Sequence, residues 1–184
     1  MKKNPNNDLL VAGARDFLKA SAAIARFGDE VYDAGFKVLT RRAGALADAL
    51  RIAVDPDKID DSPKYGYVGS RFDGTTTLIG PYVPLTDYHF FNLYVWWRAD
   101  DEHGGKEICS AVASVECRAI RVADSLHEAL RNRFRAIKRD GSEVYVEKLL
   151  QPEDFVRLDS HFEALVTQWI THSKSIGGLK KYLL

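Results

Sequence analysis

The fold is decided by two apolar segments in the middle of the chain, YHFFNLYVWWRA at residues 88–99 and KEICSAVASVECR at residues 106–118. The first is rich in aromatic and β-branched side chains, which favour extended backbone, and it is too short and too aromatic for a typical surface helix. The polar segment 100–105 lies between the two and ends in Gly104 and Gly105. This pattern predicts an antiparallel hairpin.

The centre of this turn sets which residues face each other across the hairpin. If the turn is centred near Glu102 and His103, the numbers of paired residues sum to about 205. The predicted pairs are then Trp97 with Ile108, Val95 with Ser110, His89 with Glu116, and Asp87 with Arg118. A slip of one residue would change every partner and exchange the two faces of the sheet.

Residues 8–54 are predicted to form an N-terminal pair of helices in series. Asn7 suits the N-cap, and Gly28 with Asp29 predicts a break or kink between the helices. Twelve alanines in this segment favour helix and allow two helices to approach closely. Apolar residues recur every three or four positions in two stripes, which run Leu10, Ala14, Phe17, Ser21, Ile24 and then Tyr32, Phe36, Leu39, Ala43, Leu46, Leu50, Ala53.

The remaining segments complete an α+β chain. A turn-rich connection at 55–74 precedes a strand at 75–79, which Gly80 and Pro81 stop. A helical stripe follows at 123–137, then a strand at 142–148 and a helix that begins at Pro152. The expected organisation is a single domain over 1–184, in the order α-α-β-β-β-α-β-α. It comprises a helical segment at 8–54, an α+β core at 75–172 with an antiparallel sheet, and a tail at 173–184.

The composition excludes several classes of protein. The 184 residues contain 26 basic and 26 acidic side chains, so neither a strongly basic nucleic-acid binder nor an acidic disordered chain is indicated. The chain has no apolar run of about 18 residues and no signal-peptide pattern, so we expect a cytoplasmic protein without a membrane partner. Cys109 and Cys117 lie about 26 Å apart along one strand, too far for a disulfide, which predicts buried, reduced thiols.

Four residues near one end of the predicted hairpin could carry chemistry. Asp87, His89, Glu116 and Arg118 come together in the predicted register. The simpler interpretation is a ladder of cross-strand ion pairs that stabilises the sheet. The alternative is a site for divalent metal or acid–base chemistry, with Asp87, His89 and Glu116 as metal ligands and Asp87, Glu116 and Arg118 as catalytic residues.

The same residues carry a resemblance to a known fold. The element order, with Val115-Glu116-Cys117-Arg118 closing the third strand, resembles the restriction-endonuclease-like fold. The resemblance implies that Asp87 and Glu116 would be the carboxylates that hold Mg²⁺ or Mn²⁺. Arg118 stands where that family has a lysine, and an arginine does not readily deprotonate. The resemblance covers only the middle of the chain.

Two charged segments have both a functional and a structural interpretation. Residues 131–139 include five cations that could contact nucleic-acid phosphates, or could form a solvated end of a helix. Residues 100–103 could bind a metal ion, or could form an exposed turn. The P-loop, nucleophile-elbow, Cys-x-x-Cys and His-Glu-x-x-His motifs are absent from the sequence.

The pattern as a whole favours a non-enzymatic cytoplasmic protein for binding or assembly. It would act through a helical surface or an aromatic sheet surface, need no cofactor, and form a homodimer through its N-terminal helices. The alternatives are a metal-dependent nuclease-like enzyme, active or degenerate, and a protein with a small-ligand pocket walled by the aromatic residues. Residues 55–118 contain six cations and eleven anions, which suits a bound metal better than DNA.

Overall fold

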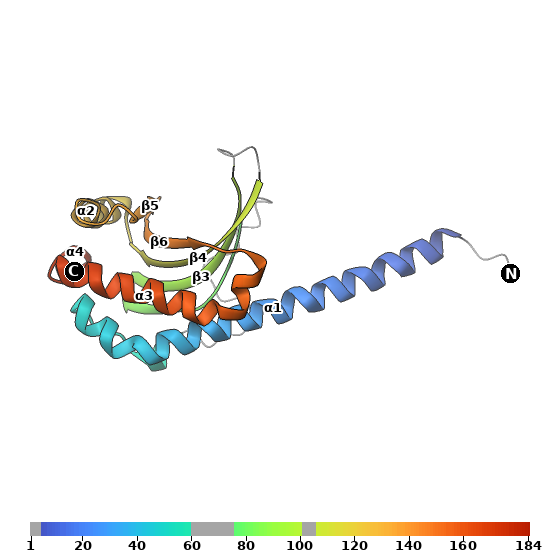
Figure 1. The fold of residues 1–184 in the computed structure, drawn as a ribbon, viewed down its shortest axis with the longest axis horizontal. Helices are drawn as coiled ribbons and strands as arrows, with labels where there is room; N and C mark the ends of the chain where they lie inside the picture. Colours follow the sequence, from blue (N-terminus) through green and yellow to red (C-terminus); the bar gives the residue numbers. More distant parts are fainter. Residues whose placement is uncertain (1–4, 60–75, 101–105) are drawn as a thin grey trace.

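The computed structural model describes residues 5–59, 76–100 and 106–184, and it confirms the α+β class with an antiparallel sheet. Figure 1 shows the long helix α1 running along the body and continuing well beyond it. Most of the predicted connection at 55–74 and of the predicted loop at 100–105, including residues 101–103 of the possible metal site, lies outside the described residues. The elements are α1 (Pro5–Leu50), the 3₁₀-helix η1 (Pro56–Lys58), β1 (Thr76–Ile79), β2 (Tyr82–Thr86), β3 (His89–Asp100), β4 (Lys106–Glu116), α2 (Ile120–Arg131), β5 (Lys138–Asp140), β6 (Glu143–Leu149), the 3₁₀-helix η3 (Pro152–Arg157), α3 (Leu158–Ser175) and α4 (Lys180–Leu183).

The N-terminal segment is one continuous helix, so the predicted break at Gly28 and Asp29 is wrong. A glycine costs a helix only about 1 kcal/mol relative to alanine, which tertiary packing readily offsets. A second glycine of this helix, Gly35, allows close packing. A Cβ at this position would lie 2.6 Å from Cδ of Pro81. The missing side chain therefore lets α1 pack directly against the edge of the sheet.

The sheet has the order β1-β3-β4-β6-β5, and β2 pairs with the first half of β3. Strands β1 and β2 thus share one edge of β3, interrupted by Gly80 and Pro81. A Cβ on Gly80 would lie 2.0 Å from the carbonyl oxygen of Leu93, so only glycine fits at this close approach. The predicted stop after residue 79 is present, but the sequence analysis missed β2.

Strands β3 and β4 pair along their whole length, one residue out of the predicted register. The paired numbers sum to 206, as in Phe90 with Glu116 and Val95 with Ala111. The predicted pairs, His89 with Glu116 among them, are therefore wrong. Side chains alternate between the two faces of a strand. The slip therefore places Glu116 on one face of the sheet and Phe91, Leu93 and Val95 on the other.

Helices α1 and α3 lie side by side against one face of the sheet, which we call the helix face (Figure 1). Phe91 and Trp169 meet there edge to face, and the indole nitrogen of Trp169 donates to the carbonyl oxygen of Ala113 at 2.8 Å. Glu163 of α3 pairs with Arg41 at 2.6 Å and with Arg42 at 3.2 Å, both on α1.

The C-terminal segment, predicted as a tail, packs against the core. Leu179 and Leu183 are buried, and the backbone N–H of Leu179 donates to the carbonyl oxygen of Leu50, the last residue of α1, at 2.8 Å. Helix α2 ends at Arg131, earlier than the predicted 137, because Lys138–Asp140 pairs with β6 as β5. Among the described residues, no helix is both long enough and apolar enough to cross a membrane.

Candidate functional site

His89, the first residue of β3, makes a hydrogen bond to the backbone just after β4. Its side chain is buried, and its Nδ1 accepts the backbone N–H of Arg118 at 3.1 Å. Burial lowers the pKa of His89, which favours the neutral ring that this hydrogen bond requires. One ring nitrogen is therefore already occupied by the protein backbone.

The other three predicted site residues lie in different environments. Asp87 is exposed between β2 and β3, and Glu116 lies opposite Phe90. The guanidinium of Arg118 lies over the ring of Tyr88, 4.3 Å from its centroid. Across the described ranges, no three His, Cys, Asp or Glu side chains are grouped as they would be to hold a metal ion.

The sheet face away from α1 and α3 contains a largely buried polar network that the sequence analysis missed. Glu143 accepts hydrogen bonds from the hydroxyl of Ser114 and, at 3.0 Å, from that of Tyr94. Asn92 donates to the same Ser114 oxygen at 3.2 Å. Burial raises the pKa of Glu143, and the neighbouring carboxylate of Glu116 raises it further, while the hydrogen bonds oppose the shift.

This network joins β3, β4 and β6, and each of its four side chains has a partner within it. Burial also raises the pKa of Tyr94 well above its ordinary value, so the phenol keeps its proton and remains a donor to Glu143. A network satisfied in this way stabilises a particular register of strands. The alternation in 143–147 could have revealed Glu143, because it places this carboxylate on the same face as Tyr145 and Glu147.

The basic segment 131–139 is largely engaged within the protein. Arg131 pairs with Glu128 at 2.9 Å, Lys138 with Glu147 at 2.5 Å, and Arg139 with Asp124 at 3.0 Å. Arg133 donates to the backbone carbonyl oxygen of Ser175. These contacts favour the structural interpretation of the segment over a nucleic-acid contact.

The first half of α1, residues 5–26, extends away from the body, and we call it the arm (Figure 1). At 1.5 Å per residue it is about 33 Å long. All side chains that the structure describes between residues 13 and 26 are exposed, and Leu18 retains 65% of its accessible surface. Exposed cations at Arg15, Lys19 and Arg26 outnumber the single anion at Asp16 in this part of the arm.

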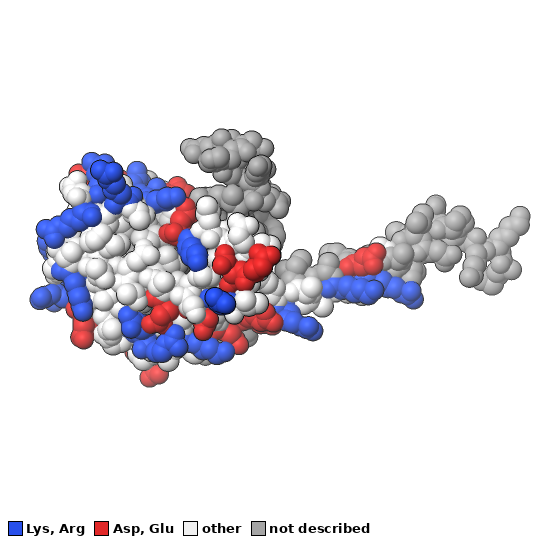
Figure 2. Space-filling model, viewed as in Figure 1, with Lys and Arg blue, Asp and Glu red and all other residues white. Residues whose placement is uncertain are grey.

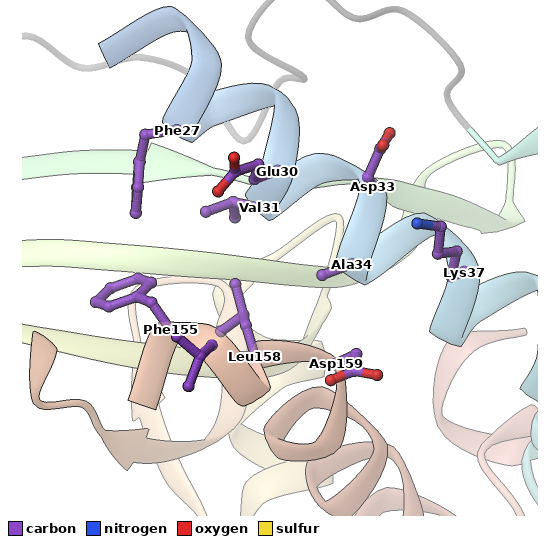
Figure 3. Close-up of a pocket in the computed structure, with 10 residues that line it drawn as sticks. Phe27, Glu30, Val31, Asp33, Ala34, Lys37, Phe155, Leu158 and Asp159 are labelled. Atoms are coloured by element: carbon purple, nitrogen blue, oxygen red, sulfur yellow. The ribbon is translucent and has the colours of Figure 1, made fainter. Parts of the chain in front are cut away.

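A groove opens beside the point where the arm leaves the body. It has a volume of about 380 Å³ and lies between α1 on one side and η3 with the start of α3 on the other. Phe27 and Val31 of α1 face Phe155 and Leu158 across it (Figure 3), and the two phenyl rings meet edge to face at 5.0 Å. The groove is also lined by Val156, which is 84% exposed.

The charged residues that line the groove are mainly acidic. Glu30, Asp33 and Asp159 contribute carboxylates, and Lys37 contributes the single ammonium group among its described lining residues. Figure 2 shows basic side chains along the arm and acidic side chains gathered where α1 meets the body. An apolar floor with an acidic border is suited to a basic, amphipathic segment.

Comparison with known proteins finds no family model, no curated protein and no solved structure that matches this chain.

Proposed function

We propose that this protein is a non-enzymatic assembly protein that forms a homodimer through the arm of α1. One observation carries the proposal, namely that the described side chains between residues 13 and 26 lie exposed on a helix that projects from the body. A projecting helix gains no tertiary packing of its own, and packing is the main source of helix stability in proteins. A partner that covers the arm supplies that packing.

A cytoplasmic location belongs to this proposal. Both cysteines are free thiols, as expected in a reducing compartment. Burial raises the pKa of each to about 12, which keeps them protonated and unreactive at neutral pH.

Light scattering on the full chain tests the proposal. We expect a dimer at micromolar concentration, and Leu18→Asp is expected to raise its dissociation constant at least tenfold, because it places a charge on the arm. Leu149→Asp is the matched control, since Leu149 is 58% exposed and lies on β6, away from the arm. A monomeric mass at every concentration, or equal effects of the two substitutions, would contradict the proposal.

A further inference from the structure

The groove between α1 and η3 lies directly beside the arm. Its floor is apolar and its described border contains three carboxylates and one ammonium. The described arm contains three cations and one carboxylate between residues 13 and 26. The two surfaces are therefore complementary in charge and are both partly apolar.

We infer that each groove receives the arm of a second copy of this chain, so that two copies exchange arms about a twofold axis. The inference rests on the proposed function and identifies the surface that the arm binds. In a twofold dimer the same two patches meet twice, which doubles the area that one contact would bury. Stable protein interfaces bury about 1,200–2,000 Å² in total, and two reciprocal helix-in-groove contacts provide a route to such an area.

The position of the twofold axis along α1 determines which charges meet, and the proposed arrangement places it near residue 24. When two α1 helices run antiparallel, a residue near position 15 of one lies beside a residue near position 33 of the other, if the axis passes near residue 24. Arg15 then approaches Asp33, and Lys19 approaches Glu30. Arg15 and Lys19 are four residues apart and share one face of the arm, as Glu30 and Asp33, three apart, share one face of the groove wall. Both pairs combine opposite charges.

The small residues of the arm permit a close approach. Ala22 and Ala23 are exposed, and Gly13 has no neighbouring atom within 4 Å of the position of a Cβ. Small side chains at a helix contact reduce the distance between the helix axes. Leu18 adds an exposed apolar side chain to the arm.

A charge-exchange experiment tests this arrangement in the full chain. The arm variant combines Arg15→Glu with Lys19→Glu, and the groove variant combines Glu30→Lys with Asp33→Lys. Each variant alone brings like charges together at both contacts, so we expect its dimer dissociation constant to rise at least tenfold. In an equimolar mixture every arm–groove contact again pairs opposite charges, and we expect a heterodimer. Asp48→Lys, on an exposed position of α1 away from the groove, is the matched control and should leave the mass unchanged.

The outcomes separate this inference from the proposed function. If Leu18→Asp dissociates the dimer but the groove variant does not, the arm mediates assembly and the groove is not its binding site. If the two charge variants stay monomeric when mixed, the proposed pairing of arm with groove is wrong. Binding of a monomeric wild-type chain to vesicles that contain anionic lipid, without self-association, would overturn both proposals in favour of a membrane partner.

Discussion

The close approach of Gly35 to Pro81 predicts that two glycines of α1 respond oppositely to the same substitution. Gly44 is exposed, and a Cβ there would meet no atom within 4 Å. Gly44→Ala is therefore expected to stabilise the protein by about 0.8–1 kcal/mol, the difference in helix propensity between the two residues. For a protein of this size, that change raises the melting temperature by about 2–4 °C.

Gly35→Ala gains the same helix propensity, but a steric clash opposes this gain in stability. The new methyl group would lie 2.6 Å from Cδ and 2.7 Å from Cγ of Pro81, whose ring is buried and cannot rotate away. Overpacking of a core by one methyl group costs about 1–3 kcal/mol. The net change is then a loss of up to about 2 kcal/mol, and the two variants should differ by about 1–3 kcal/mol.

Thermal and denaturant unfolding of the two variants, measured side by side, provide the assay. Gly44→Ala is the internal control, because it makes the same chemical change in the same helix. If Gly35→Ala proves as stabilising as Gly44→Ala, α1 does not pack against Pro81 as described. The direction in which the arm leaves the body would then also be in question.

Three further predictions concern buried and charged groups. A thiol probe should label Cys117, which is 3% exposed, more slowly than the partly exposed Cys109 in the native protein, and denaturation should remove the difference. Mg²⁺ or Mn²⁺ should leave the melting temperature unchanged; a rise that is lost in both Asp87→Asn and Glu116→Gln would instead support the metal-dependent alternative. The raised pKa of Glu143 means that the folded state retains a proton that the unfolded chain releases, so this residue's contribution to stability falls as pH rises above its ordinary pKa. Glu143→Gln should remove that contribution, and denaturant unfolding at several pH values would refute it if variant and wild type kept parallel profiles.

Strands β1, β3, β4 and β6 were predictable because their signals are local, whereas β2 and β5 were missed. Aromatic and β-branched residues fill β3, and the alternation in β6 is clear over a few positions. The pairing register of β3 with β4 has no such local signal, because it depends on the turn that joins the two strands. An error of one residue placed Glu116 beside His89, whereas its neighbours across the sheet are Phe90 and Glu143. Because the period of a strand is two, this small error changed the whole candidate site.

The errors in the helices have another origin. Gly28 with Asp29 is a plausible break by local propensity, but α1 continues through it because packing against the body outweighs the cost of a glycine. Helix α2 ends early because Lys138–Asp140 pairs with β6 as β5, through a turn at Gly141 and Ser142 in which Gly141 has a φ of 52°. The apolar residues Phe134 and Ile137 fit the helical period but reach the core from outside the helix.

The continuity of α1 would favour the assembly proposed for the arm. Starting a helix is costly, whereas extending one from an existing turn is much less so. Residues 31–50 are anchored by the body through Val31, Val38 and Leu46, so the arm extends a helix that folding has already started. A partner then meets a segment that is already helical, and less ordering entropy is lost on binding than with an unfolded peptide. Substitutions that weaken the anchored half should therefore weaken dimerisation as well, even where they touch neither the arm nor the groove.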